Sequence, residues 1–265
     1  MNHIFREGSA FNQDIGSWDV RNVESFVYAF LNSSFDRDIS SWDVSGANNL
    51  SGMFYNAQNF NQDIGAWDVS NVTFFVSLFF NASSFNQPLD SWNMASATET
   101  RYMFYGCSSF NQNLNSWDVS NVTTFERMFL GCTNFDGNIS SWTPTSALNM
   151  SVMFYNCTNF NSNIGAWDVS SVTSMNSMFT NASAFDQDLG SWNVSNVTDF
   201  VNFMGNKTPS TFSATNLDAI YNGWDSRAVQ TPITINFGTA KYTAASSTAR
   251  ASLVGKGWAI TDGGI

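Results

Sequence analysis

Hydrophobic positions recur along this chain with a period of about 25 residues. Tryptophan marks the period, with one interval of 24 residues followed by six of 25. The column consists of Trp18, Trp42, Trp67, Trp92, Trp117, Trp142, Trp167 and Trp192. Two phenylalanine columns that start at Phe5 and Phe11 keep nearly the same spacing. A fixed period between 20 and 50 residues is typical of repeat proteins, so we predict about eight stacked units over residues 1–204.

Within one period the pattern predicts two short elements. Residues 72–82 carry apolar side chains three and four positions apart, as one face of a helix does. These side chains are Val72, Phe75, Leu78, Phe79 and Ala82. Residues 67–69 read Trp-Asp-Val, which alternates as a half-buried strand does. The predicted fold is an α/β repeat solenoid with one short strand and one short helix per coil, in which each coil covers the apolar face of the next.

The two ends of the array differ from its interior. Residues 205–265 lose the period and read as helix, strand, helix and strand, which predicts a C-terminal α/β capping unit. Residues 3–11 look like the second half of a repeat. Because a terminal coil normally needs a polar cap, we expect an upstream segment or a stacking partner there, and self-association through the N-terminal coil is one form that this could take.

One repeat in particular carries a family resemblance. Residues 170–194 read SSVTSMNSMFTNASAFDQDLGSWNV and resemble the repeat of the BspA-type leucine-rich-repeat surface proteins. The resemblance covers residues 4–204 and weakens at residues 141–148, where Thr143 and Pro144 stand in the strand. It implies a leucine-rich-repeat-like solenoid and surface adhesion or recognition, with a protein or glycan receptor. It implies no catalytic residues.

Composition and charge reduce the number of possible partners and locations. The net charge is −11 and only ten residues are Lys or Arg, which argues against a nucleic-acid partner. No apolar run reaches 18 residues, so we expect no membrane insertion, and the first residues lack the pattern of a secretory signal. The family resemblance favours an extracellular or cell-surface location, and the lack of a secretory signal favours a virion location. A structural component of a virion or phage tail fibre is the alternative function.

Aromatic and other apolar residues at unexpected places are the candidate contact positions. One aromatic-rich column comes directly after the Met-Phe pair of each repeat or its equivalent, and a second group lies where the predicted helix should face solvent. The candidate binding residues are Tyr28, Tyr55, Phe74, Val76, Phe80, Tyr105 and Tyr155. If the column reaches the surface it could bind sugar rings or a protein, and if it points inward it is core.

Two polar columns have simpler explanations than a binding site. Asp and Asn interchange after each Trp, as at Asp68 and Asn93, which favours turn hydrogen bonds over a calcium ladder. We therefore predict no metal and no cofactor, with calcium as the weaker alternative. Cys107, Cys132 and Cys157 share a column with alanines, which predicts buried thiols.

Catalysis has little support in the sequence. The only histidine is His3, so Ser-His and Cys-His nucleophile systems are disfavoured. A carboxylate pair for glycoside cleavage should stand out from the repeat, and none does. We predict that the protein is not an enzyme, with a carbohydrate-active enzyme as the remote alternative.

Overall fold

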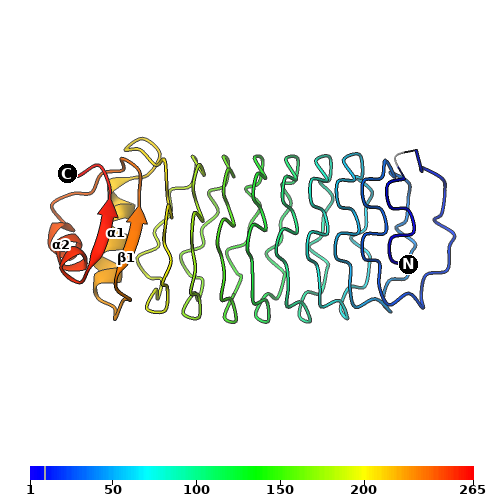
Figure 1. Cartoon of the computed structure of the whole chain (residues 1–265), viewed down its shortest axis with the longest axis horizontal. Helices are drawn as coiled ribbons and strands as arrows, with labels where there is room; N and C mark the ends of the chain where they lie inside the picture. Colours follow the sequence, from blue (N-terminus) through cyan, green and yellow to red (C-terminus); the bar gives the residue numbers. More distant parts are fainter. Residues whose placement is uncertain (9) are drawn as a thin grey trace.

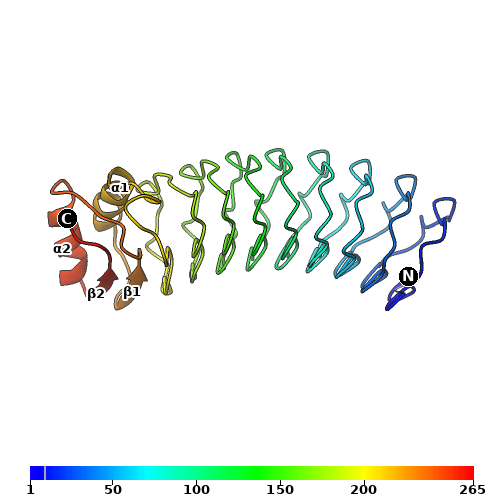
Figure 2. The ribbon, with the colours of Figure 1, turned by 90° about the horizontal axis from the view of Figure 1, so that it is seen from above.

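The computed structural model describes residues 1–8 and 10–265. The chain winds into a row of similar coils that lie side by side along the long axis, and a cap with helices and strands covers the C-terminal end (Figure 1). Seen from above, the row bends into a shallow arc (Figure 2). The 25-residue period of the sequence thus corresponds to one coil.

Backbone hydrogen bonds join each coil to the next. In one coil the N–H groups of Phe75, Ser77 and Phe79 donate to carbonyls of the following coil at 2.8–3.0 Å. Single parallel bridges connect one position of every coil, namely Ser25, Asn49, Phe74, Glu99, Thr124, Asn149, Ser174 and Asp199. Each bridged residue begins an eight-residue segment, such as 25–32, 49–56 and 74–81. The outward-facing side chains of these segments form a surface that we call the ladder face.

The predicted helix in each coil is absent, which corrects that part of the sequence-based fold. Within residues 1–8 and 10–212 the structure assigns no helix. Ser77 and Asn81 have φ of +55° and +54°, and left-handed residues recur at the equivalent places of the other coils. A left-handed residue every fourth position breaks an α-helix, so the N–H groups of this segment bond to the next coil instead. Phe75, Leu78 and Phe79 nevertheless point inward and are fully buried.

Residues 67–69, which were predicted to be a strand, form an irregular segment between two turns. The N–H of Trp67 donates to the carbonyl of Ile64, three residues earlier, and Val72 bonds in the same way to Val69. Trp67 and Val69 are buried and Asp68 is exposed, so the alternation of faces is present without strand pairing. Extended pairing between coils lies instead in the segment that was predicted to be helical.

One continuous core runs through the array. The rings of Trp92, Trp117 and Trp142 follow one another at centroid distances of 6.2–6.3 Å with planes within 6°. Each buried indole also donates a hydrogen bond to the preceding coil, as from Trp117 Nε1 to the Leu89 carbonyl at 2.8 Å. Trp18 begins the column and is 42% exposed. The tryptophan column therefore combines ring packing with satisfied polar groups.

The three cysteines fill a small slot in this core. All are free and buried, and their thiols donate to the carbonyls of Phe79, Phe104 and Phe129. Burial raises the pKa of each thiol. These cysteines are thus packed as small core residues in the uncharged form.

The cap contains the regular secondary structure of the described chain. Its elements are α1 (Ala214–Asp225), β1 (Ile233–Asn236), α2 (Ser247–Gly255) and β2 (Trp258–Thr261). Strands β1 and β2 pair in parallel, and Ile235 of β1 bridges to Phe200 of the last coil. Helix α1 supplies Trp224, whose Nε1 donates to the Leu189 carbonyl at 2.9 Å. The cap therefore continues both the backbone ladder and the tryptophan column.

A buried lysine closes the cysteine and alanine column at the cap. Lys207 is 2% exposed, and its Nζ donates to the carbonyls of Ala182, Phe185 and Thr211. Its ammonium also lies 5.8 Å from the Phe185 ring centroid. Burial lowers the pKa of Lys207 to about 8, so the group is mostly charged at pH 7.

Candidate recognition surface on the ladder face

Six rings form a chain of aromatic contacts along the ladder face. They come from five successive coils at the N-terminal end of the array. The rings, which we call the aromatic strip, are His3, Tyr28, Tyr55, Phe80, Tyr102 and Tyr105. The four tyrosines and Phe80 are half-buried, and His3 is exposed. The column that was predicted to be either core or surface is therefore part of the surface.

The middle of the strip is a stack of parallel rings. Tyr55 and Phe80 lie 4.3 Å apart with planes at 1°, and Phe80 and Tyr105 lie 4.2 Å apart at 6°. Both faces of Phe80 are covered by its neighbours in the stack, so Phe80 presents its ring edge outward. Burial raises the pKa of the Tyr55 phenol, and the neighbouring tyrosines add to this effect.

A glycine makes room for the first tyrosine of the strip. Gly52 has φ of +62°, and a Cβ atom at this position would overlap the Tyr28 ring. Other coils carry Ser, Tyr, Arg or Val at the equivalent position. Gly52 thus holds Tyr28 flat against the ladder face, with its ring 6.1 Å from Tyr55 in an edge-to-face arrangement.

The remaining candidate residues flank the strip or lie outside it. Phe74 is 42% exposed, and Val76 is half-buried, on the same coil as Phe80. Tyr155 is half-buried in the same column as Tyr105 but two coils further on. Sequence reasoning missed Tyr102 and His3, although Tyr102 shares a column with Tyr28 and could have been found from that spacing.

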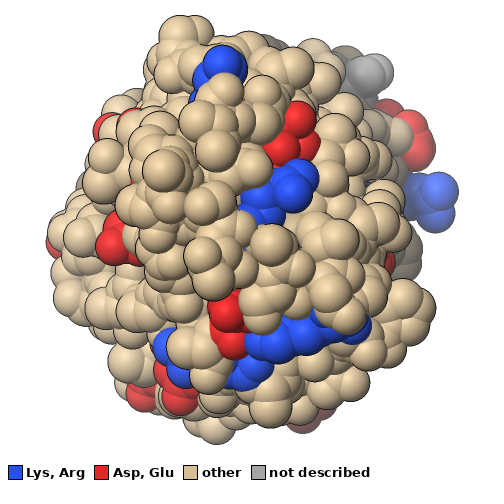
Figure 3. All heavy atoms as spheres, turned by 90° about the vertical axis from the view of Figure 1, so that its left-hand side faces the viewer, with Lys and Arg blue, Asp and Glu red and all other residues tan. Residues whose placement is uncertain are grey.

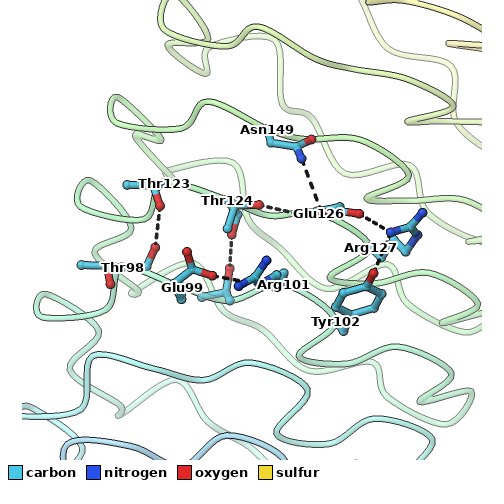
Figure 4. Close-up of polar contacts among 10 residues, drawn as sticks. Thr98, Glu99, Arg101, Tyr102, Thr123, Thr124, Glu126, Arg127 and Asn149 are labelled. Carbon is cyan, nitrogen blue, oxygen red and sulfur yellow. Dashed lines mark hydrogen bonds and ion pairs between the residues drawn. The ribbon is translucent and has the colours of Figure 1, made fainter.

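Four charged residues border the strip on the fourth and fifth bridged coils. Arg101 Nε lies 3.1 Å from Glu99 Oε2, and Arg127 pairs with Glu126 (Figure 4). We call these residues the ion-pair group. Arg127 Nη1 also donates to the Tyr102 hydroxyl at 2.7 Å, which places the guanidinium 5.4 Å from that ring centroid. The aromatic strip therefore ends at fixed charges of both signs.

The acidic column beside the tryptophans makes turn hydrogen bonds. Asp68 Oδ1 accepts from the N–H of Ser70 at 3.0 Å, and Asn93 Oδ1 accepts from Ala95 in the same way at 3.1 Å. Bonds from Ser70 lower the pKa of the Asp68 carboxyl from 3.8. Among residues 1–8 and 10–265 no group of three or more His, Cys, Asp or Glu side chains is arranged to hold a metal. The hydrogen bonds of Asp68 and Asn93, which are the same for the charged and the uncharged side chain, favour the turn explanation over a calcium ladder.

Asparagine should therefore replace Asp68 without loss of stability at pH 7. We expect Asp68→Asn to keep the free energy of unfolding, and Asp68→Ala to lower it by about 1 kcal/mol, because alanine leaves the Ser70 N–H without its acceptor. The lowered pKa means that the carboxylate stabilises the fold above pH 3.8 and that this contribution is lost as pH falls. Urea denaturation at pH 7 and pH 3 measures both effects. Stabilisation of the wild type by calcium that is absent in Asp68→Asn would contradict the turn explanation.

A surface pocket of about 420 Å³ lies at the N-terminal end of the strip. His3, Tyr28 and Tyr55 line it together with Arg6, Glu7 and Asn32. The pocket thus places three rings beside a charged pair and an amide.

One comparison with known proteins gives a match. The family model described as "Mycoplasma protein of unknown function, DUF285" matches four overlapping regions, residues 1–73, 28–142, 102–219 and 131–248. No curated protein and no solved structure matches the chain. Neither α1 nor α2, the helices of the described residues, is long and apolar enough to cross a membrane.

Proposed function

The chain belongs to the DUF285 family, a repeat family of unknown function, and from this premise we propose that it is a non-enzymatic recognition protein that binds a protein partner through the ladder face. The observation that carries the proposal is the aromatic strip. Half-exposed tyrosines give large contact areas at low entropic cost and are enriched among the residues that dominate binding energy in protein interfaces.

The stacked rings favour a protein over a glycan at the centre of the strip. Sugars bind aromatic residues through open ring faces, but the faces of Phe80 are covered by Tyr55 and Tyr105. Ring edges and phenol hydroxyls suit the mixed apolar and polar surface of a protein. Phe74, 42% exposed on the same coil as Phe80, extends this apolar area.

The ion-pair group supplies a polar boundary to the contact. The equivalent positions of the other coils hold mostly Ser, Asn or Val. Ion pairs at a protein surface contribute little to folding stability, so stability does not explain why this part of the array carries four charged residues. Charges at the rim of an interface set orientation and select between partners. Arg127, held against Tyr102, is placed to do this.

The wider setting is also part of the proposal. A repeat solenoid displayed on a surface, as the resemblance to BspA-type proteins suggests, would present this face on a stiff support. The stacked coils support the solenoid, although each coil lacks the helix of the leucine-rich-repeat pattern.

Removing the stack should abolish binding while leaving the fold intact. We expect peptides selected on the wild type from a phage-displayed random library to bind Tyr55→Ser/Phe80→Ser/Tyr105→Ser at least about 100-fold more weakly, since each lost anchor costs more than about 1 kcal/mol. Tyr155→Ser is the matched control, because Tyr155 is equally half-buried in the same column but outside the strip.

Unchanged peptide affinity in the triple variant would contradict the proposal. So would a glycan array on which the wild type binds saccharides and Tyr105→Ser does not, since Tyr105 lies in the stack but does not line the N-terminal pocket, and the partner at the stack would then be a glycan. Thermal unfolding of all variants verifies that lost binding does not reflect lost structure.

Assembly into a larger particle is the second candidate, and one observation favours it. Trp18 and Ile4 are 42% and 47% exposed at the N-terminal coil, where interior coils bury the equivalent residues. A stacking partner there, including a second copy, would cover them. Light scattering distinguishes this role, because a defined oligomer that Trp18→Ser disperses would support packing over receptor recognition.

A further inference from the structure

The pocket at the N-terminal end of the strip has a rigid polar wall. Asn81 Nδ2 donates to Asn56 Oδ1 at 3.1 Å, and Asn56 Nδ2 donates to Asn32 Oδ1 at 2.8 Å. Asn32 Nδ2 then donates to both carboxylate oxygens of Glu7, at 2.9 and 3.0 Å. This amide chain runs in one direction across four coils and ends at Glu7, so that it fixes the carboxylate at the pocket wall.

The wall offers donors and acceptors together. Arg6 Nε lies 3.6 Å from Glu7 Oε1, and both side chains are more than half exposed. The guanidinium balances the carboxylate, which leaves the pocket close to neutral. Such a pair can hydrogen-bond adjacent hydroxyl groups, one acting as donor and the other as acceptor. Because the two charges balance, the pair favours a neutral ligand over a charged one.

The rings give the pocket an apolar side. Tyr55 uses one face against Phe80, so its other face is turned toward Tyr28, where the pocket lies. This is the end of the parallel stack, and Tyr55 lines the pocket there. The Tyr28 ring, seated on Gly52, stands edge-to-face to Tyr55 at 6.1 Å.

We propose that this pocket binds a short neutral saccharide, with the apolar face of a sugar ring against Tyr55 and its hydroxyls on Glu7 and Arg6. A volume of about 420 Å³ lies within the usual range for small-ligand sites. A polar pair on one side and aromatic rings on the other match a ligand that has both hydroxyl groups and an apolar face. The site goes beyond the protein contact proposed for the stack, because Tyr55 is the only residue of the stack that lines the pocket.

Saturation-transfer NMR with a panel of neutral mono- and disaccharides tests the site. We expect at least one saccharide to bind the wild type. Glu7→Gln should weaken it about tenfold or more, since glutamine keeps an acceptor for Asn32 but loses the charge-assisted bond to the ligand. Tyr28→Asn should weaken it as well, and asparagine tolerates the left-handed backbone there, where φ is +52°.

Controls separate this site from the protein contact. Tyr105→Ser, which removes part of the stack but no pocket residue, should leave saccharide binding unchanged. The proposal is overturned if no saccharide of the panel binds, if Glu7→Gln and Tyr28→Asn bind as the wild type does, or if choline binds in place of the saccharides. Because Glu7→Gln leaves the stack untouched, its peptide binding tests the proposed protein contact independently.

Discussion

Trp117→Ala is expected to lower the free energy of unfolding by about 4 kcal/mol, the largest effect among the single substitutions considered. Trp117 is 3% exposed and lies between Trp92 and Trp142 at 6.3 and 6.2 Å. Alanine leaves a cavity between two rings and removes the Nε1 hydrogen bond to the Leu89 carbonyl, which then accepts from the Trp92 N–H alone. Urea denaturation followed by circular dichroism measures the loss.

Two matched variants separate the contribution of the indole hydrogen bond from that of ring packing. Trp117→Phe keeps an aromatic ring but removes the Nε1 donor, so we expect a loss of about 1–3 kcal/mol from the missing hydrogen bond and the smaller ring. Trp18→Ala removes the same side chain where it is 42% exposed, and should cost clearly less than Trp117→Ala. If Trp18→Ala costs as much as Trp117→Ala, packing within the column is not the main contribution.

Lys207→Met is expected to destabilise the protein by about 3 kcal/mol. Methionine has a similar length but cannot donate, so the buried carbonyls of Ala182, Phe185 and Thr211 lose the ammonium that they share. These carbonyls lie where the last coils meet the cap. The junction should therefore open first, and hydrogen exchange should rise in residues 182–212 before it rises in the middle of the array.

Lys241→Met is the control for this effect. Lys241 lies in the same cap, but it is exposed and donates only to the carbonyl of Ile265. We expect its replacement to change the free energy of unfolding by less than about 0.5 kcal/mol. Equal losses in the two variants would show that the buried cage contributes nothing specific.

The inward-facing columns could be predicted from the sequence, because residues three and four positions apart share a face in the observed backbone path as well as in a helix. Phe75, Leu78, Phe79 and Ala82 were predicted to share an apolar face, and all four are fully buried. A helix and a succession of left-handed turns both return to the same face after three or four residues. The spacing alone therefore cannot tell them apart.

A second signal in the sequence does distinguish the two paths. Asn32, Asn56, Asn81 and Asn156 share a column that holds glycine at residues 106 and 131. Asparagine and glycine are the residues that most readily adopt positive φ, and they are poor choices for one fixed position of a helix. All of them have φ above +50°. The periodic Asn and Gly, weighed against the apolar spacing, predict the observed turns.

The candidate surface could be predicted only in part. Tyr55, Phe80 and Tyr105 stand out in the sequence as an aromatic column. Their exposure depends on the backbone conformation of the segment, which was predicted to be a helix and is a series of turns. The contacts of Tyr102 with Arg127 and of Tyr28 with Gly52 join residues 25 and 24 positions apart. Such contacts become visible only when the alignment between coils is known.

The bonds between coils also determine how the molecule would respond to tension. Every coil holds about 25 residues, which span about 85 Å when extended, within a step of only about 5 Å along the array. Pulling the two ends apart would load the bonds of the outermost coil before those of its neighbours. The array would therefore lengthen one coil at a time, and each release would absorb mechanical work while the remaining coils keep their shape and the surface that they carry.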